Sequence, residues 1–370
     1  MTSDLKELLD LAHRSVEIIS SYQDAGGAYP ASPAFPVYGF CWFRDGAFIA
    51  DAMSRAGSAT SAERFFTWCS DVLVARSTEI RSLVQRSIGG ESVGRDEYLP
   101  TRYTVSGGVT GEDWWDFQLD GYGTWMWALV EHSRRHGTAL EPFRPAVQLS
   151  VRYLCEFWRQ PCFDWWEEHP DQVHPSTLGA ILAGLRSASG TALLDDELTM
   201  RCQETCTSIE VLLGTEAVAD GHLVKSIGRT DVDASLIACL TPFGVEPPAS
   251  PIAEATYATI VRDLAPDGVH RYVGDTFYGG GRWVVLAGFV GWHEAITGRT
   301  DIALERLRWM HAQATAQGYL PEQVTTHSLE PEWVARWEQK WGPVATPLLW
   351  SHAMYITLAH TLGLLDQGTP

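Results

Sequence analysis

Apolar residues recur at helical spacing along almost the whole chain, and this pattern restricts the folds that it can adopt. From Asp4 to Ile19, for example, the apolar positions share one stripe of a helix, and an acid lies in the first turn. Similar stripes predict helices near residues 44–56, 60–86, 118–135, 143–158, 175–187, 192–213, 231–240, 251–264, 282–297, 299–316 and 345–364. A strand ladder is not evident, so the sequence predicts an all-α protein.

Long loops rich in Gly, Pro and aromatic residues separate the predicted helices, near residues 26–39, 88–115, 161–175, 241–251, 268–281 and 318–343. Long helices that alternate with such loops are typical of helical hairpins that close into an α/α barrel, and long loops usually carry function. The composition does not shift along the chain, and the Pro-rich stretch before Pro251 is interpreted as a turn between helices. We therefore expect a single catalytic domain over residues 1–370.

The balance of charges argues against a nucleic-acid partner, because 46 acidic residues outnumber 27 basic ones and give a net charge of −19. The sequence has no apolar run long enough for a transmembrane helix, and its first residues lack the basic-then-apolar order of a signal peptide. We therefore expect a cytoplasmic protein without a membrane partner.

The seven cysteines are scattered, without a zinc-type or CxxC spacing. Cys202 and Cys206 lie one helical step apart, which favours two buried, reduced thiols over a metal or redox pair. The twelve histidines show no metal-ligand spacing, and the sequence contains no nucleophile elbow, HExxH or Walker motif. These observations indicate acid/base chemistry without a metal or another cofactor.

Aromatic residues are abundant, with 16 Trp, 12 Tyr and 13 Phe, and many of the tryptophans neighbour Gly, Asp, Glu or Arg. An indole can stack on the apolar face of a sugar ring while nearby carboxylates and guanidinium groups bind the hydroxyls. This mixture indicates a carbohydrate site, and five segments of the chain carry it.

The first segment contains Tyr38, Trp42, Arg44 and Asp45 and leads directly into a predicted helix. An Asp at this position could simply cap the helix, with Trp42 packed beside it. In the functional interpretation, Arg44 and Asp45 hold two neighbouring hydroxyls of a sugar.

The second segment, residues 111–123, surrounds the paired indoles of Trp114 and Trp115 with acids and an amide, including Gln118 and Asp120. A helix start rich in acids explains part of this composition. It gives no reason for two adjacent tryptophans, which we interpret as part of the sugar site.

The third segment, residues 163–170, places the adjacent carboxyls of Glu167 and Glu168 beside Trp165 and Trp166. Either acid alone could be a solvated surface charge. Beside bulky aromatics, however, a carboxyl is desolvated and its pKa rises, as a general acid that works near neutral pH requires. The other acid would stay ionised and bind a hydroxyl.

The fourth segment begins at Arg271, contains Tyr278 and ends at Trp283, with three consecutive glycines inside it. The glycines lack the spacing of a phosphate-binding loop and are interpreted as a turn that lets the backbone approach a ligand.

The fifth segment joins Glu322, in a Pro-bounded loop beside Gln323, to the later Trp350. Glu322 is either a surface acid in a turn or a base that positions and deprotonates a water.

In their order along the chain, these five segments resemble those of glycoside hydrolase family 15, the glucoamylase and glucodextranase family. The resemblance runs from about Tyr29 to His352. It implies an (α/α)6 barrel and an exo-acting glycoside hydrolase that cleaves a terminal α-glucosidic bond with inversion and releases β-glucose. The implied partner is a small glucose-containing oligosaccharide, without a cofactor; the sequence makes no prediction of an oligomeric state.

The resemblance also implies roles for individual residues. Glu167 matches the family's general acid, and Glu322 matches its general base. The family's aromatic-Trp-x-Arg-Asp segment forms the floor of its glucose subsite, and a second, substrate-binding acid follows its general acid. We expect the substrate to be bound by Tyr38, Trp42, Arg44, Asp45, Trp114, Trp115, Gln118, Asp120, Trp166, Glu168, Arg271, Tyr278, Trp283 and Trp350.

The chain has no room for the N-terminal β-sandwich of most bacterial members, so it resembles the compact members that hydrolyse isomaltose. We therefore expect an α-1,6 linkage, in isomaltose or short isomaltooligosaccharides, with the leaving sugar shaped by the loops around residues 114–115 and 325–343. Three alternatives stay open: an α-1,4-acting glucoamylase, a trehalase-like hydrolase, and a non-catalytic carbohydrate-sensing domain on the same barrel. Retention of both Glu167 and Glu322 favours catalysis.

Overall fold

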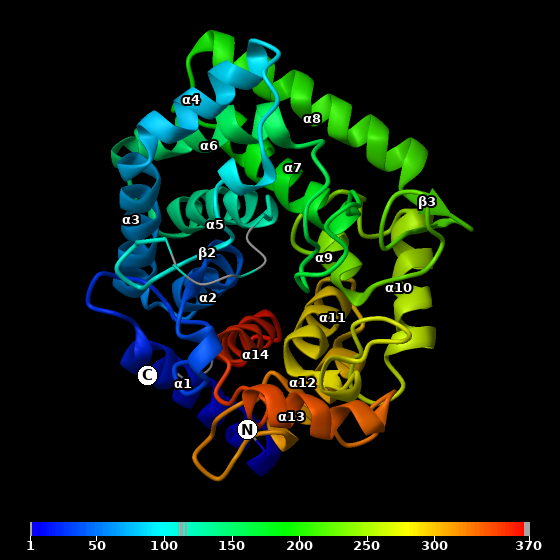
Figure 1. Ribbon diagram of the computed structural model, residues 1–370. Helices are drawn as coiled ribbons and strands as arrows, with labels where there is room; N and C mark the ends of the chain where they lie inside the picture. Colours follow the sequence, from blue (N-terminus) through cyan, green and yellow to red (C-terminus); the bar gives the residue numbers. More distant parts are fainter. Residues whose placement is uncertain (1, 110, 112–113, 115–116, 366–370) are drawn as a thin grey trace.

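Six helices form a closed inner ring in the computed structural model, which describes residues 2–109, 111, 114 and 117–365 (Figure 1). In chain order the ring contains α2 (Phe43–Arg55), α5 (Asp120–His136), α7 (Pro175–Ser189), α9 (Ile237–Leu240), α11 (Val284–Ile296) and α14 (Leu349–Thr361). Each helix packs on the next one, and α14 packs back on α2. The ring is therefore complete.

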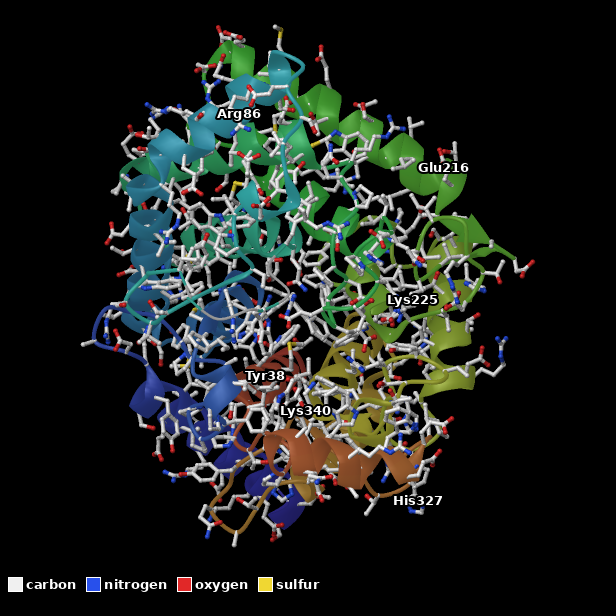
Figure 2. The ribbon with its side chains drawn as sticks, viewed as in Figure 1. Tyr38, Arg86, Glu216, Lys225, His327 and Lys340 are labelled. Carbon is white, nitrogen blue, oxygen red and sulfur yellow. The ribbon has the colours of Figure 1, made fainter. Side chains whose placement is uncertain are left out.

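A second ring of helices surrounds the first one (Figure 1). It contains α1 (Ser3–Tyr22), α3 (Ala59–Ala75), α6 (Arg144–Phe157), α8 (Asp196–Glu216), α10 (Pro251–Leu264) and α12 (Thr300–Ala312). Outer and inner helices alternate along the chain, so the protein is the predicted (α/α)6 barrel. Figure 2 shows the same arrangement in the side chains, with Arg86 and Glu216 on the rim and Tyr38 nearer the centre.

The two rings differ in how their surfaces are buried. Every residue from Phe43 to Ser54 in α2 is buried, because this helix contacts neighbours on all sides. Outer helix α8 buries only one stripe, which includes Leu198, Cys202 and Ile209. The burial of apolar side chains between the rings is the main force that holds the barrel together.

Two glycines let inner helices α5 and α7 approach closely. A Cβ atom on Gly123 of α5 would lie 2.3 Å from the backbone oxygen of Ala180, and one on Gly184 of α7 would lie 2.4 Å from that of Gly123. Neither position has room for a methyl group.

Three short antiparallel pairs of strands are the only strands in the described residues. They are β1 (Cys41–Trp42) with β2 (Arg102–Tyr103), β3 (Val218–Ala219) with β4 (His222–Leu223), and β5 (Arg282–Trp283) with β6 (Gln323–Val324). The β1–β2 pair sets Trp42 opposite Arg102, and the β5–β6 pair sets Trp283 opposite Gln323. The β1–β2 pair joins the loop before α2 to the loop before α5, and the β5–β6 pair joins the loop before α11 to the loop after α12.

Short 3₁₀ helices occur in the connecting loops, at η1 (Pro36–Tyr38), η2 (Arg95–Glu97), η3 (Glu141–Phe143), η4 (Ala234–Leu236), η5 (Phe277–Gly279) and η6 (Pro331–Trp333). None of the helices in the described part of the chain is both long and apolar enough to cross a membrane. All seven cysteines are buried and unpaired, as predicted.

The structure corrects three of the predicted helices and loops. The helix predicted over 60–86 is interrupted at Arg76, whose φ of −100° and ψ of 13° leave the helical region, so α3 and α4 (Ser77–Ile88) are separate. The helix predicted over 231–240 begins only after Asp233, whose side chain accepts a hydrogen bond from the backbone of Ser235 and starts η4. The loop predicted over 318–343 contains α13 (Val334–Trp341), an eight-residue helix that has no buried residue.

Candidate active site

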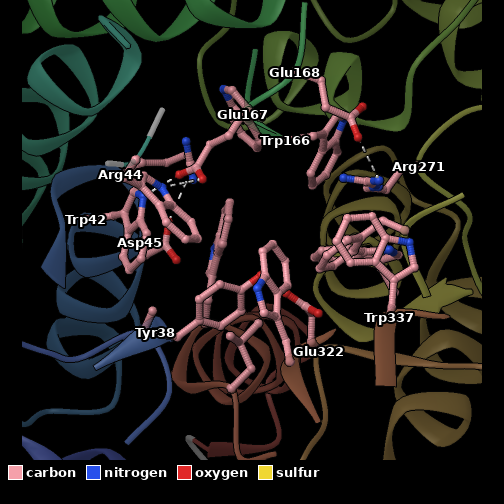
Figure 3. Close-up of a pocket in the computed structure, with 18 residues that line it drawn as sticks. Tyr38, Trp42, Arg44, Asp45, Trp166, Glu167, Glu168, Arg271, Glu322 and Trp337 are labelled. Carbon is pink, nitrogen blue, oxygen red and sulfur yellow. Dashed lines mark hydrogen bonds and ion pairs between the residues drawn. The ribbon is translucent and has the colours of Figure 1, made fainter. Parts of the chain in front are cut away.

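A cavity opens at the end of the barrel where α2, α11 and α14 begin (Figure 3). Its space, including the open mouth, is about 830 Å³, which is within the usual size of small-molecule sites. Its wall is formed by the loops before these three helices, by the loop before α5 and by the loop between α6 and α7. All five segments singled out in the sequence contribute to this one cavity.

Glu167 lies in a tight turn in the loop between α6 and α7. Its φ of 62° is in the left-handed region, which a residue other than glycine adopts only where its surroundings fix the backbone. The backbone N–H of Glu167 donates to the oxygen of Asp164 at 3.0 Å, and that of Asp164 donates to the oxygen of Glu168 at 2.9 Å. The carboxylate of Asp164 also accepts from the backbone N–H groups of Trp166 and Glu168, at 3.0 and 2.9 Å. These bonds turn the Glu167 side chain into the cavity (Figure 3).

Two indoles bind the carboxylate of Glu167. Nε1 of Trp42 donates to Oε1 at 2.6 Å, and Nε1 of Trp114 donates to Oε2 at 2.8 Å. Burial raises the pKa of Glu167 to about 7, although the Arg44 charge and the two indole bonds act in the opposite direction. A carboxyl with this pKa can carry a proton at neutral pH and release it, as a general acid must.

Glu322 lies on a different wall of the cavity, immediately before β6 (Figure 3). Its backbone N–H donates to the oxygen of Ala345 at 2.9 Å, and its backbone oxygen accepts from Val284 at 3.1 Å. Side-chain atom Oε2 is buried and has no hydrogen-bond partner among the described residues. Burial raises the pKa of Glu322 to about 8, and the Arg271 charge opposes this rise. The unpartnered oxygen is well suited to accept a proton from a water molecule.

Glu167 and Glu322 therefore face one cavity from segments far apart in the sequence. Burial raises the pKa of Glu167 to about 7 and that of Glu322 to about 8, so each carboxyl can gain and lose a proton near neutral pH; the order of the two values does not assign the acid and the base. One protonated and one ionised carboxyl on different sides of a bound molecule is the arrangement that acid/base hydrolysis of a glycoside needs.

Arg44 and Asp45 lie at the floor of the cavity, in the first turn of α2. Nε of Arg44 lies 3.2 Å from Oδ1 of Asp45, so the two buried side chains form an ion pair. Burial raises the pKa of Asp45 to about 6. The N-cap residue of α2 is Trp42, so the structure does not support a simple capping role for Asp45.

Arg271 supplies a second buried guanidinium. It donates to both carboxylate oxygens of Asp275, at 2.7 and 2.5 Å, and to Oε1 of Glu168 at 3.3 Å (Figure 3). The hydroxyl of Tyr272 donates to the other oxygen of Glu168. Asp275 thus anchors Arg271, while Glu168 and Arg271 together line the cavity.

Indoles form much of the remaining wall. Trp166 and Trp283 lie with ring centroids 5.3 Å apart, and Trp114 stacks on Trp341 of α13 at 6.1 Å. The N–H groups of Trp283 and Trp350 are buried without a hydrogen-bond partner among the described residues. Since an unpaired buried donor is costly, these groups are suited to bind the polar atoms of a ligand.

Most of the residues predicted from the sequence meet at the cavity. Those that line it are Tyr38, Trp42, Arg44, Asp45, Trp114, Trp166, Glu167, Glu168, Arg271, Trp283, Glu322 and Trp350. Trp115 lies outside the described residues.

Three predicted residues lie behind the wall instead of in it. Gln118 and Asp120 each accept a hydrogen bond from Nη1 of Arg44 at 3.0 Å, so they orient Arg44 and do not line the cavity. The hydroxyl of Tyr278 donates to the backbone oxygen of Gly342 at 2.8 Å and so holds the end of α13. Polar residues of one motif can bind the ligand directly, or they can orient another residue that binds it. Spacing in the sequence does not distinguish these two roles.

The sequence analysis missed several lining residues. Phe277, Trp337 and Trp341 line the cavity together with Trp165 and Leu348. The Trp-rich stretch before Pro343 was the available signal for α13, with Val334, Trp337 and Trp341 on one helical face, but a helix of only eight residues does not stand out from the surrounding loop.

A metal ion has one candidate group of ligands in the described residues. Ligand atoms of Asp164, Glu168 and His169 lie within 4.8 Å of one another. The ammonium of Lys225 lies 3.9 Å from Oδ2 of Asp164 and supplies positive charge at this place. The group therefore fits an internal ion pair better than a metal.

Comparison with known proteins gives matches along nearly the whole chain. Residues 8–289 match the model of the family described as glycosyl hydrolases family 15. An isomaltose glucohydrolase of Kribbella flavida is 48% identical over 369 residues, which cover 99% of this chain and 96% of that protein.

Solved structures agree in the fold. A glycosidase variant in complex with glucose is 46% identical and superposes with a TM-score of 0.96, over 98% of this chain and 99% of that one. A bacterial glucoamylase complexed with acarbose is 20% identical, with a TM-score of 0.75 over 96% of this chain and 56% of that one. The second likeness supports the barrel alone.

Proposed function

The chain belongs to family 15 of the glycosyl hydrolases, and from this premise we propose that it is an inverting, exo-acting α-glucosidase. Its substrates are isomaltose and short isomaltooligosaccharides, from which it releases β-glucose at the non-reducing end. Residues 1–370 act as one catalytic domain, because the last inner helix, α14, packs on both α1 and α2 and closes the barrel.

The observation that carries this proposal is the presence of two carboxyls, the buried Glu322 and the partly buried Glu167, in one aromatic-walled cavity. Each has a pKa raised toward neutrality by burial, and each has a different set of neighbours. A protein that only binds sugar needs hydroxyl ligands, but it does not need two carboxyls that can exchange protons near pH 7.

Glu167 acts as the general acid in this proposal. Its proton passes to the glycosidic oxygen as the bond to the anomeric carbon breaks, and the departing sugar leaves as an alcohol. The indoles of Trp42 and Trp114 stabilise the carboxylate that remains, since each donates a hydrogen bond to one of its oxygens.

Glu322 acts as the general base. Its Oε2 accepts a proton from a water, and the oxygen of that water attacks the anomeric carbon from the face opposite to the leaving group. Attack from the opposite face inverts the configuration, so an α-glucoside gives β-glucose. The Arg271 charge favours the ionised form of Glu322 that this step requires.

The floor of the cavity binds the terminal glucose. Arg44 and Asp45 offer a donor and an acceptor side by side, which suits a pair of neighbouring hydroxyls. Glu168 and Arg271 offer a second such pair on another wall. A closed floor accepts a chain end but not the middle of a chain, which supports exo action.

The α-1,6 linkage is proposed from the similarity to the isomaltose glucohydrolase of Kribbella flavida, which covers the catalytic segments. The leaving sugar would lie near Trp114 and Trp341, which stack at the mouth of the cavity.

A substrate panel tests this proposal. Initial rates on isomaltose, maltose and trehalose should give the highest kcat/KM for isomaltose. A higher kcat/KM for maltose or trehalose would show that the enzyme prefers the α-1,4 or the α,α-1,1 linkage instead. Release of no glucose from any of the three sugars would favour a sugar-binding protein without activity.

A further inference from the structure

Lys225 is a buried lysine behind the catalytic loop, outside the cavity lining (Figure 2). It follows β4, and its side chain is only 4% exposed. Its ammonium lies 3.0 Å from Oδ2 of Asp233, 3.9 Å from Oδ2 of Asp164 and 3.0 Å from the centre of the Tyr272 ring. One buried cation therefore contacts three different segments of the chain.

Both aspartates beside Lys225 hold the turn that presents Glu167. Oδ1 of Asp164 accepts from the backbone of Trp166 and of Glu168, the two residues that flank Glu167. The carboxylate of Asp233 accepts from Nε1 of Trp166, with distances of 3.1 and 2.9 Å to its two oxygens. The backbone on both sides of Glu167 thus depends on carboxylates that share one counter-ion.

Several acids surround Lys225, so their ionisation depends on its positive charge. Asp164, Asp233 and Glu168 form a group of neighbouring acids that are wholly or partly buried. Burial raises the pKa of Asp164 to about 7 although the Lys225 charge opposes this rise, whereas the Lys225 charge and the bonds from Ser235 hold the pKa of Asp233 below its ordinary value against the effect of burial. Without the ammonium, the two buried carboxyls would lose their shared counter-ion, so one of them would move or take up a proton. A protonated or displaced Asp164 would be a poorer acceptor for the two backbone N–H groups.

Lys225 also contacts the loop that holds Glu167 and Glu168 indirectly, through Tyr272. Its ammonium lies over the ring of Tyr272, whose hydroxyl donates to Glu168. His169 and His174 also face this charge; burial lowers the pKa of both histidines, and the Lys225 charge acts in the same direction. Burial, the carboxylates and the ring together confine the lysine to one position.

We propose that Lys225 is a positioning residue for the general acid: its ammonium holds Asp164 and Asp233 in the geometry that fixes the strained turn at Glu167. This inference rests on the proposed function, and it goes beyond it by assigning a role to a residue that does not touch the substrate. Loss of the ammonium lets the turn relax, and the acid then no longer points at the glycosidic oxygen.

The test compares substrates with a poor and a good leaving group. Isomaltose needs a proton from the acid, whereas the fluoride of α-glucosyl fluoride departs with little help. For Lys225→Met, we expect kcat on isomaltose to fall by roughly 10- to 100-fold, part of what general acid catalysis supplies, with kcat on the fluoride within about 3-fold of the parent. Glu167→Gln, which lacks the acid altogether, should show the same selectivity to a greater degree.

Arg55→Met is the matched control. Arg55 pairs with the buried Asp51 at 2.7 Å, at the far end of α2 from Arg44, so its loss also removes a cation from a buried carboxylate, which keeps Arg135 at 2.9 Å as a second partner. Both substrates should be hydrolysed by this variant as by the parent. Melting temperatures of the two Met variants separate a loss of stability from a loss of acid catalysis.

Lys225→Arg gives a second measurement if Lys225→Met does not fold. It keeps the charge, and its fluoride-to-isomaltose rate ratio should lie between those of the parent and Glu167→Gln. An unchanged ratio in the folded variants, or an equal fall on both substrates, would overturn the positioning role. Failure of the parent itself to cleave isomaltose would instead overturn the proposed function.

Discussion

The indole nitrogen of Trp114 lies 2.8 Å from Oε2 of Glu167 and stabilises its ionised form. The same carboxylate accepts a second indole hydrogen bond, from Trp42. In the proposed mechanism Glu167 must be protonated before the bond breaks and ionised afterwards. Trp114 therefore favours the product side of the proton transfer.

Replacement of Trp114 by Phe should keep the aromatic wall and remove this hydrogen bond. We expect kcat on isomaltose to fall by roughly 10- to 100-fold, because a hydrogen bond to a charged group contributes roughly 1.5–3 kcal/mol. Steady-state kinetics measure the effect, with Trp158→Phe, on the outer helix layer, as the control. Equal kcat values for the Trp114 variant and the parent would show that the bond has no role in turnover.

Replacement of either catalytic candidate by its amide should abolish most activity without unfolding the protein. Glu167→Gln and Glu322→Gln each keep the shape of the side chain but cannot transfer the proton, so kcat on isomaltose should fall by roughly 10²- to 10⁴-fold. Circular dichroism spectra should match that of the parent. Near-parental turnover by either folded variant contradicts the role assigned to that residue.

The stability of the protein should depend on pH through Glu322. Its pKa is about 8 in the folded protein and near 4.5 when it is exposed, so between these values the folded state binds more protons. Stability from this group is therefore greatest below pH 4.5 and falls as the pH rises toward 8. Glu322→Gln should raise the free energy of unfolding at pH 8 by roughly 1 kcal/mol or more, and by less at pH 4.5. A gain that is the same at both pH values would show that Glu322 does not titrate in this window.

The close approach of α5 and α7 gives a prediction about folding alone. A methyl group on Gly184 would lie 2.4 Å from the backbone oxygen of Gly123, so Gly184→Ala should cost about 1–3 kcal/mol of stability. Gly214→Ala in α8 is the control, because nothing lies within 4 Å of its Cβ position and alanine favours a helix. In thermal unfolding, the melting temperature should be lower for Gly184→Ala than for the parent, and unchanged or higher for Gly214→Ala. The opposite order would contradict the packing of the inner ring.

The alternation of helices could be predicted from the sequence because each apolar stripe is local. Helix α10 begins and ends at residues 251 and 264, as predicted, since Ser250 caps it and its apolar stripe is continuous. Helix α13 was missed although Val334, Trp337 and Trp341 share one helical face, because it is only eight residues long and lies inside a loop rich in Gly, Pro and aromatic residues. A segment of two turns is too short for periodicity to separate a helix from a loop.

The sequence predicted which residues belong to the candidate site, but not which of them line the cavity and which support the lining residues from behind. The cavity brings together Glu167, Glu322 and most of the expected binding residues. Gln118 and Asp120, however, contact Arg44, and Lys225 was not singled out although it contacts the carboxylates behind the catalytic turn. Such supporting contacts join residues far apart in the sequence, and no local pattern records them.

The stereochemistry of the first product tests the central claim most directly. Proton NMR of isomaltose hydrolysis, recorded before mutarotation, should show β-glucose as the first anomer from the non-reducing end, because water activated by Glu322 attacks opposite the leaving group. α-Glucose as the first product would contradict an inverting acid/base pair of Glu167 and Glu322.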